Sequence, residues 1–256
     1  MSFSRVTALG AAFLLVGVAA CDGGADGTGG SGGAGGNGGA GGGTPSGEEL
    51  FSGPESAALG SANNEATCAT CHSNDGSQDG MPGNTMKDIA FRESFKGGDA
   101  PKLLDGVNAC VTGWMGGTAL TDSSAEFQAI KTYFESISDP SATTPNAIAP
   151  EVLTNESAYE AKYGGGDPTA GAAAYAKACA RCHDEALTVN VIQAPAKTSL
   201  KGYTVGRIAQ QVRTSGPPPS SMMDASDTTP GPMPFFEAKD LSDTDLQNII
   251  AHLKGQ

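Results

Sequence analysis

Histidine is scarce in this chain of 256 residues, with three copies, and only one tryptophan is present. Charged residues make up 17% and aromatic residues 6%, so apolar side chains alone would build a thin core. Basic residues are also few, because 15 Lys and Arg stand against 28 Asp and Glu, a formal charge of −13. This balance argues against a nucleic-acid partner and suits a partner protein with a basic docking face.

Long apolar runs are absent except near the N-terminus. Arg5 precedes an apolar run over Val6–Ala20, which is short for a bilayer span and typical of a signal peptide over residues 1–20. The residues Val18–Cys21 resemble a bacterial lipobox, which predicts that Cys21 is lipidated and anchors the protein to a membrane. An ordinary signal peptide cut near Ala20 is the alternative. Either way we expect export, and the lipobox predicts a membrane-anchored lipoprotein facing the periplasm or cell surface.

The rest of the chain divides by composition. Residues 21–46 form the anchor and a Gly-rich tether. The tether has no large apolar side chains with which to build a hydrophobic core. Residues 141–156 contain two Pro and three Thr and are typical of a linker. We therefore predict a first domain over 47–140 and a second over 157–256.

The two predicted domains follow one plan. Each is expected to open with a helix leading into a Cys-x-x-Cys-His motif and to close with an amphipathic helix. In the second domain the opening helix covers 172–178, and Ser242 with Asp245 forms a capping pattern for the last helix. Its apolar face comprises Leu246, Ile249, Ile250 and Leu253. In the first domain Ser123 and Glu126 form the same pattern before Phe127, Ile130, Phe134 and Ile137. Strand signals are scarce, so the fold should be mostly α with long loops.

The motifs Cys68–His72 and Cys179–His183 carry the clearest chemistry. On a helix the two thiols, Cys68 with Cys71 or Cys179 with Cys182, stand at i and i+3, while the His is i+4 from the first thiol. This geometry lets two thiols bond the vinyl groups of one haem while His72 or His183 binds its iron. We expect two covalently bound haem c groups.

Two other interpretations of Cys-x-x-Cys are a thioredoxin-like redox pair and half of a zinc site. Two copies, each with an adjacent His, in an exported chain without a further Cys pair favour haem attachment over both.

These motifs resemble class I cytochrome c, and the second domain is the closer match. The resemblance rests on Gly171–His183, on Gly231–Phe236 and on Leu241–Leu246 leading into the last helix. It implies two tandem cytochrome c-like domains, each folded around a covalent haem. In that family the Met of a Met-Pro element approaches the iron opposite the His.

The sixth iron ligands must mostly be Met or Cys, because two of the three His belong to the motifs and His252 should lie on a packed helix. For the second haem we expect Met233, in a Pro-bounded loop before the last helix, with Met222 and Met223 as alternatives. For the first haem we expect Met115, which holds the same place in the repeat. Met81 and Met86 are alternatives there.

Cys110 is the cysteine left over once the other five are assigned. It is either a buried, inert thiol or a haem ligand or sulfur-reactive group. The segment around Cys110 and Met115 resembles dihaem cytochromes of the thiosulfate dehydrogenase type, in which a Cys thiolate ligates the catalytic haem.

We therefore expect an electron carrier that passes single electrons between redox partners through two His/Met haems, with no catalytic residue of its own. The alternative function is a haem oxidoreductase that acts on a small sulfur compound through the first haem and Cys110. A dihaem peroxidase would need a set of acid–base residues that the chain does not clearly show.

Overall fold

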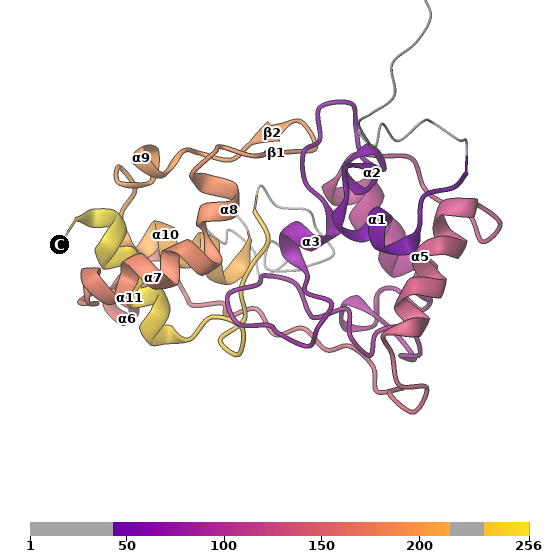
Figure 1. Cartoon of the computed structure of the whole chain (residues 1–256). Helices are drawn as coiled ribbons and strands as arrows, with labels where there is room; N and C mark the ends of the chain where they lie inside the picture. The colour runs from indigo at the N-terminus through magenta and orange to yellow at the C-terminus, as the bar shows by residue number, and fades with distance from the viewer. Residues whose placement is uncertain (1–42, 216–232, 256) are drawn as a thin grey trace, which may run out of the picture. The chain divides into compact units, whose positions relative to one another are not determined.

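Helices and long loops make up nearly all of the computed structural model, which describes residues 43–215 and 233–255 (Figure 1). The predicted signal peptide, Cys21, nearly all of the tether, Met222 and Met223 lie outside these residues. The prediction of a mostly α fold is confirmed. The first half contains α1 (Gly47–Ser52), α2 (Pro54–Ala58), α3 (Cys68–Cys71), η1 (Lys96–Gly98), α4 (Leu103–Asn108), η2 (Ala109–Trp114) and α5 (Ala125–Ser136).

The second half adds further helices and a small hairpin. Its elements are α6 (Glu156–Tyr163), α7 (Pro168–Ala178), α8 (Ala180–His183), β1 (Thr188–Val189), β2 (Ile192–Gln193), α9 (Lys197–Leu200), α10 (Val205–Thr214) and α11 (Asp243–Lys254). The two strands pair antiparallel. Within the described ranges, no helix has the length and apolar character needed to span a membrane.

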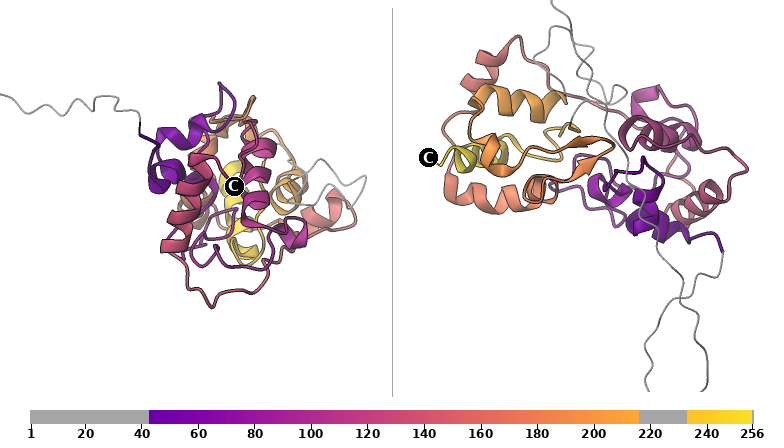
Figure 2. Two further views of the ribbon diagram at one scale, coloured as in Figure 1. Left: turned by 90° about the vertical axis from the view of Figure 1, so that its right-hand side faces the viewer. Right: turned by 90° about the horizontal axis from the view of Figure 1, so that it is seen from above.

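One hydrophobic core, here called the second core, lies where α7 packs against α11 and α6 packs against α10 (Figures 1 and 2). The predicted last helix is confirmed, because the Ser242 side chain accepts a hydrogen bond from the Asp245 backbone N–H. The apolar face predicted for α11 is buried in this core. Gly171 lets the two helices approach closely, since an added Cβ would lie 1.9 Å from the Asn248 carbonyl oxygen.

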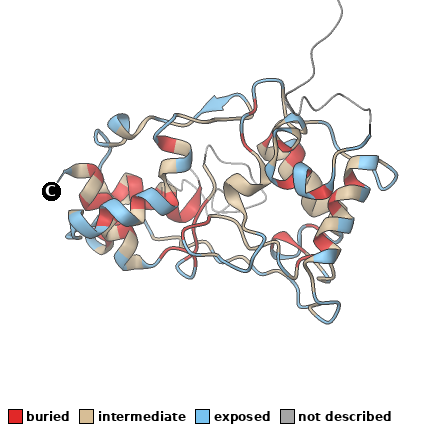
Figure 3. Ribbon diagram, in the orientation of Figure 1, coloured by how far each residue is buried: buried red, intermediate tan, exposed pale blue. Residues whose placement is uncertain are grey.

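The other core, here called the first core, lies where α1 packs against α5 (Figure 3). Its buried residues include Leu50, Phe51, Ile130 and Phe134. The prediction that Ser123 caps α5 is wrong, because the N-cap is Ser124. The Ser124 hydroxyl donates instead to the Thr121 carbonyl and closes the preceding turn.

The segments that lead into the two motifs differ. In the second half α7 ends at Ala178, directly before the motif, as predicted. In the first half α2 ends at Ala58, and the expected helix before Cys68 is absent from this described stretch. The Asn64 amide donates to the carbonyls of Ala57 and Ala66, so a side chain closes this loop in place of helical hydrogen bonds.

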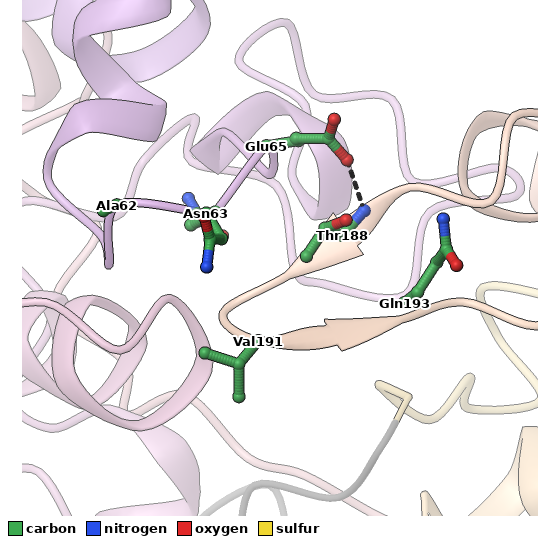
Figure 4. A pocket seen from close by; sticks show the side chains of 7 residues that line it. Ala62, Asn63, Glu65, Thr188, Val191 and Gln193 are labelled. Atoms are coloured by element: carbon green, nitrogen blue, oxygen red, sulfur yellow. Dashed lines mark hydrogen bonds between the residues drawn. The ribbon is translucent and has the colours of Figure 1, made fainter. Parts of the chain in front are cut away.

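The β1–β2 hairpin lies against the loop at 61–65 (Figure 4). The Thr188 N–H donates to Glu65 Oε2 at 2.6 Å, and the Glu65 N–H donates to the Thr188 carbonyl at 2.9 Å. At the hairpin turn the Asn190 N–H donates to Asn64 Oδ1 at 3.1 Å. These bonds connect the two halves of one compact unit.

Candidate functional site

Both Cys-x-x-Cys-His motifs form a single helical turn. The His72 N–H donates to the Cys68 carbonyl at 3.0 Å, and the His183 N–H donates to the Cys179 carbonyl at the same distance. This i to i+4 bond brings the imidazole and the two thiols of each motif onto one side of the turn.

The two imidazoles are held in the same way. Nδ1 of His72 lies 2.7 Å from the Asn84 carbonyl oxygen, and Nδ1 of His183 lies 2.7 Å from the Pro195 carbonyl oxygen. A carbonyl accepts only from a protonated ring nitrogen, so Nδ1 carries the proton and Nε2 keeps its lone pair. Metal-binding His residues are commonly oriented in this way. Gly83 permits the close approach beside His72, since a Cβ there would lie 2.3 Å from the ring.

One continuous cavity is lined by both motifs. The space between its walls, together with open solvent at its mouth, amounts to about 1730 Å³. From the motifs it is lined by Cys68, Cys71, His72, Cys179, Cys182 and His183. Apolar side chains of the first core, among them Ile89, Phe95, Ile130 and Phe134, line it as well.

These residues fit a covalently bound haem. The walls are mostly apolar, each His has its Nδ1 already bonded and its Nε2 available, and two thiols accompany each ring. Burial raises the pKa of the Cys68 thiol to about 11 and that of Cys179 to about 12, so neither has the low pKa of a thioredoxin-like nucleophile. Among the residues that the structure describes, no cluster of three or more His, Cys, Asp or Glu side chains could hold a bare metal ion.

The expected Met ligands both line this cavity. Met115 is buried, and Met233 is half-buried against the second core. Of the alternatives, Met86 also lines the cavity, whereas Met81 is buried away from it. His252 contacts the Tyr175 ring at 5.8 Å between centroids, which agrees with a packing role.

The Met233 loop is fastened to the end of α10. The Ser215 hydroxyl donates to the Met233 carbonyl, and the Phe236 N–H donates to the Val212 carbonyl at 2.7 Å. Arg213, fully buried, donates to the Phe236 carbonyl at 3.1 Å. The loop therefore has three hydrogen bonds that limit where the Met233 sulfur can move.

Arg213 is itself the centre of a polar network. Its guanidinium pairs with Asp243 at 2.9 Å and with Glu151 at 3.8 Å, and its Nε donates to the Tyr163 hydroxyl at 2.9 Å. The sequence alone did not predict this network, because its members lie in four separate segments of the chain.

Cys110 lies beside the imidazole of His72. It belongs to η2, a π-helical turn in which the Met115 N–H donates to the Cys110 carbonyl at 2.9 Å. Burial lowers the pKa of the His72 imidazole. A hydrogen bond with the Cys110 side chain and the charge of Cys110 raise this pKa, and the net shift of the pKa is upward. Because Nδ1 of His72 bonds to the Asn84 carbonyl, Nε2 is the ring nitrogen that makes the hydrogen bond with Cys110. Lys96, buried and also lining the cavity, was not predicted as a pocket residue.

The family model described as cytochrome C oxidase, cbb3-type, subunit III matches residues 166–253. This stretch contains the motif with His183 and also Met233. Residues 166–253 form a cytochrome c family domain. A cytochrome c domain implies a covalent haem c with its iron, and electron transfer as the activity.

A solved structure of thiosulfate dehydrogenase from Marichromatium purpuratum, in its as-isolated form, is similar to this chain with 18% identity and a TM-score of 0.35. The match covers 81% of this chain and 44% of the other, so the chain spans less than half the length of that structure. Among curated proteins, none matches the sequence.

Proposed function

We propose that the chain is a dihaem cytochrome c that transfers single electrons between redox partners. The supporting observation is the repeated geometry of the two His residues. His72 and His183 each direct Nδ1 to a carbonyl twelve residues later, at the same distance of 2.7 Å. The second motif lies within the cytochrome c domain, and the first motif has the same arrangement outside it.

In this proposal the four motif thiols form the thioether links, and His72 and His183 bind the irons through Nε2. Met115 and Met233 are the sixth ligands, which favours a high reduction potential. Each haem supplies an iron that takes up and releases one electron. The protein holds the ligands in place and keeps water out of the apolar cavity.

The number of haems tests the proposal directly. We expect the mass of the holoprotein and its pyridine haemochrome spectrum to give two haem c groups per chain. Replacement of Cys68 and Cys71 by Ala should leave one haem, and replacement of Cys179 and Cys182 by Ala should leave the other. A single haem in the unaltered protein would contradict the proposal.

A second candidate function is a haem oxidoreductase that acts on a small sulfur compound at the first haem. The observation that favours it is the hydrogen bond between Cys110 and His72, because it places a thiol on the side of the imidazole that would face the iron. A Cys there would be a thiolate ligand or a reactive sulfur next to the iron.

The ferric holoprotein distinguishes the two functions by its optical and EPR spectra. An electron carrier with Met115 as ligand should show two low-spin haems that change in Met115→Ala and stay the same in Cys110→Ser. A thiolate-type signal that is lost in Cys110→Ser would favour the oxidoreductase, and thiosulfate would then be the first substrate to assay.

We also propose that the protein is exported and anchored through lipidated Cys21, and that its acidic surface docks a basic redox partner. The formal charge of −13 supports the second part, since charge complementarity accelerates encounter. Reduction by a basic donor protein should slow as salt is added. A salt-independent rate would contradict this docking proposal.

A further inference from the structure

Arg181 connects the two Cys-x-x-Cys-His motifs. It is one of the two residues between Cys179 and Cys182, and its Nη1 donates to the Ala69 carbonyl at 3.2 Å and to the Thr70 carbonyl at 3.0 Å. Ala69 and Thr70 are the two corresponding residues of the other motif. The middle of one motif is therefore hydrogen-bonded to the middle of the other.

The acceptors lie at the end of a very short helix. α3 has four residues, and its last carbonyls point away from the helix without i to i+4 partners of their own. A guanidinium at this C-terminal end satisfies two carbonyls and also complements the partial negative charge there. A hydrogen bond from a charged donor is stronger than one from a neutral donor.

The second thiols of the two motifs are neighbours at this contact. Cys71 directly follows Thr70, whose carbonyl accepts from Arg181, and Cys182 directly follows Arg181 itself. Both thiols line the same cavity.

Other contacts hold the two halves together away from the motifs. Hydrogen bonds join Glu65 to Thr188 of the hairpin, and an ion pair joins Lys177 to Asp79. Removal of the Arg181 side chain would therefore leave the two halves joined and would break only the hydrogen bonds between α8 and α3.

We propose that Arg181 is a positioning residue that holds the two haem-attachment segments at a constant separation and so sets the rate of electron transfer between the haems. This inference rests on the proposed function, because it requires a haem at each motif. In the step that Arg181 controls, one iron goes from ferrous to ferric and the other from ferric to ferrous. No bond is formed or broken and no proton moves.

The test uses the holoprotein with Arg181→Met, Arg181→Lys and the control Lys177→Met. The control also removes a cation between the two halves, but one that lies outside the motifs. After rapid one-electron reduction, the equilibration between haems is followed optically at several protein concentrations. We expect a concentration-independent phase that slows severalfold in Arg181→Met, because the two attachment segments are no longer held at a constant separation. Arg181→Lys should recover part of the rate, and Lys177→Met should leave it unchanged.

Amide hydrogen exchange supplies a second readout that does not depend on electron transfer. In Arg181→Met we expect faster exchange in the segment that contains α3 and unchanged exchange in α11. Two haems with an unchanged inter-haem rate in Arg181→Met would overturn the role of Arg181 alone. A single haem in the unaltered protein would overturn the proposed function together with this inference.

Discussion

Nδ1 of His183 lies 2.7 Å from the carbonyl oxygen of Pro195, twelve residues further along the chain. The bond selects one tautomer of the imidazole and stops the ring from turning. Because His72 has the same bond to Asn84, the same local arrangement occurs twice in this sequence. Under the proposed function, this bond orients each ring to bind an iron through Nε2.

The ligand role proposed for Met233 leads to a spectroscopic prediction. Met233→Ala should remove the weak red absorption band of one ferric haem and lower its reduction potential, because a thioether ligand favours the ferrous state. Absorption spectroscopy with a redox titration checks this. Met81→Leu is the matched control, since Met81 is buried but does not line the cavity. An unchanged red band in Met233→Ala would show that another residue ligates this haem.

The Arg213 network leads to a prediction about stability. Arg213→Met should lower the free energy of unfolding by about 2 kcal/mol, because it removes one of the two cations that pair with Glu151 and Asp243, the other being Lys162, and leaves the Phe236 carbonyl without a donor. Urea denaturation of the holoprotein measures the change. The exposed Lys239→Met is the control and should change stability little.

Under the proposed function, the same variant should also alter the haem attached at the second motif. Since Arg213 fastens the loop that carries Met233, we expect a weaker red band in Arg213→Met even in the fully folded protein. A loss of stability without any change in this band would contradict the link between Arg213 and the loop.

Asp240 leads to a prediction about pH. Burial raises the pKa of its carboxyl group from 3.8 to about 6, Glu237 adds to this, and Lys239 and Arg213 oppose it. Its Oδ1 is buried and has no hydrogen-bond partner. Between these two pKa values the folded protein binds more protons than the unfolded chain. The free energy of unfolding therefore falls as pH rises through this window and stays lower above it.

The contribution of this group is up to about 3 kcal/mol, since one pKa unit corresponds to about 1.4 kcal/mol. Asp240→Asn should remove the decline and stabilise the protein above about pH 6. Urea unfolding on both sides of the window checks this. A pH dependence that is the same in Asp240→Asn and in the unaltered protein would contradict the role of Asp240.

The N-terminal cysteine leads to a prediction about location. Cys21→Ser should release the protein from the membrane fraction, because acyl chains on Cys21 would be its only anchor under this proposal. Cell fractionation and the mass of the mature N-terminus measure the outcome. Membrane association that persists in Cys21→Ser would favour a different mode of attachment.

Local patterns predicted much of the fold. The Ser242 cap and the apolar face of α11 follow from the sequence because a helix depends on residues three and four positions apart. The predicted cap of α5 is wrong by one residue. Ser123 and Ser124 are equivalent N-cap candidates in the sequence, and only the hydrogen bond from the Ser124 hydroxyl to the Thr121 carbonyl distinguishes them. The prediction of a helix directly before Cys68 is wrong, because the Asn64 side chain closes a loop there.

The sequence by itself determined the two Cys-x-x-Cys-His turns and the helical character of the chain, since both follow from spacings of a few residues. Only the tertiary structure decided which groups meet across long separations: Cys110 with His72, Arg213 with the Met233 loop, and Arg181 with the opposite motif. The physical reason is that such contacts depend on how the helices pack, and packing is set by the burial of apolar surface over the whole fold.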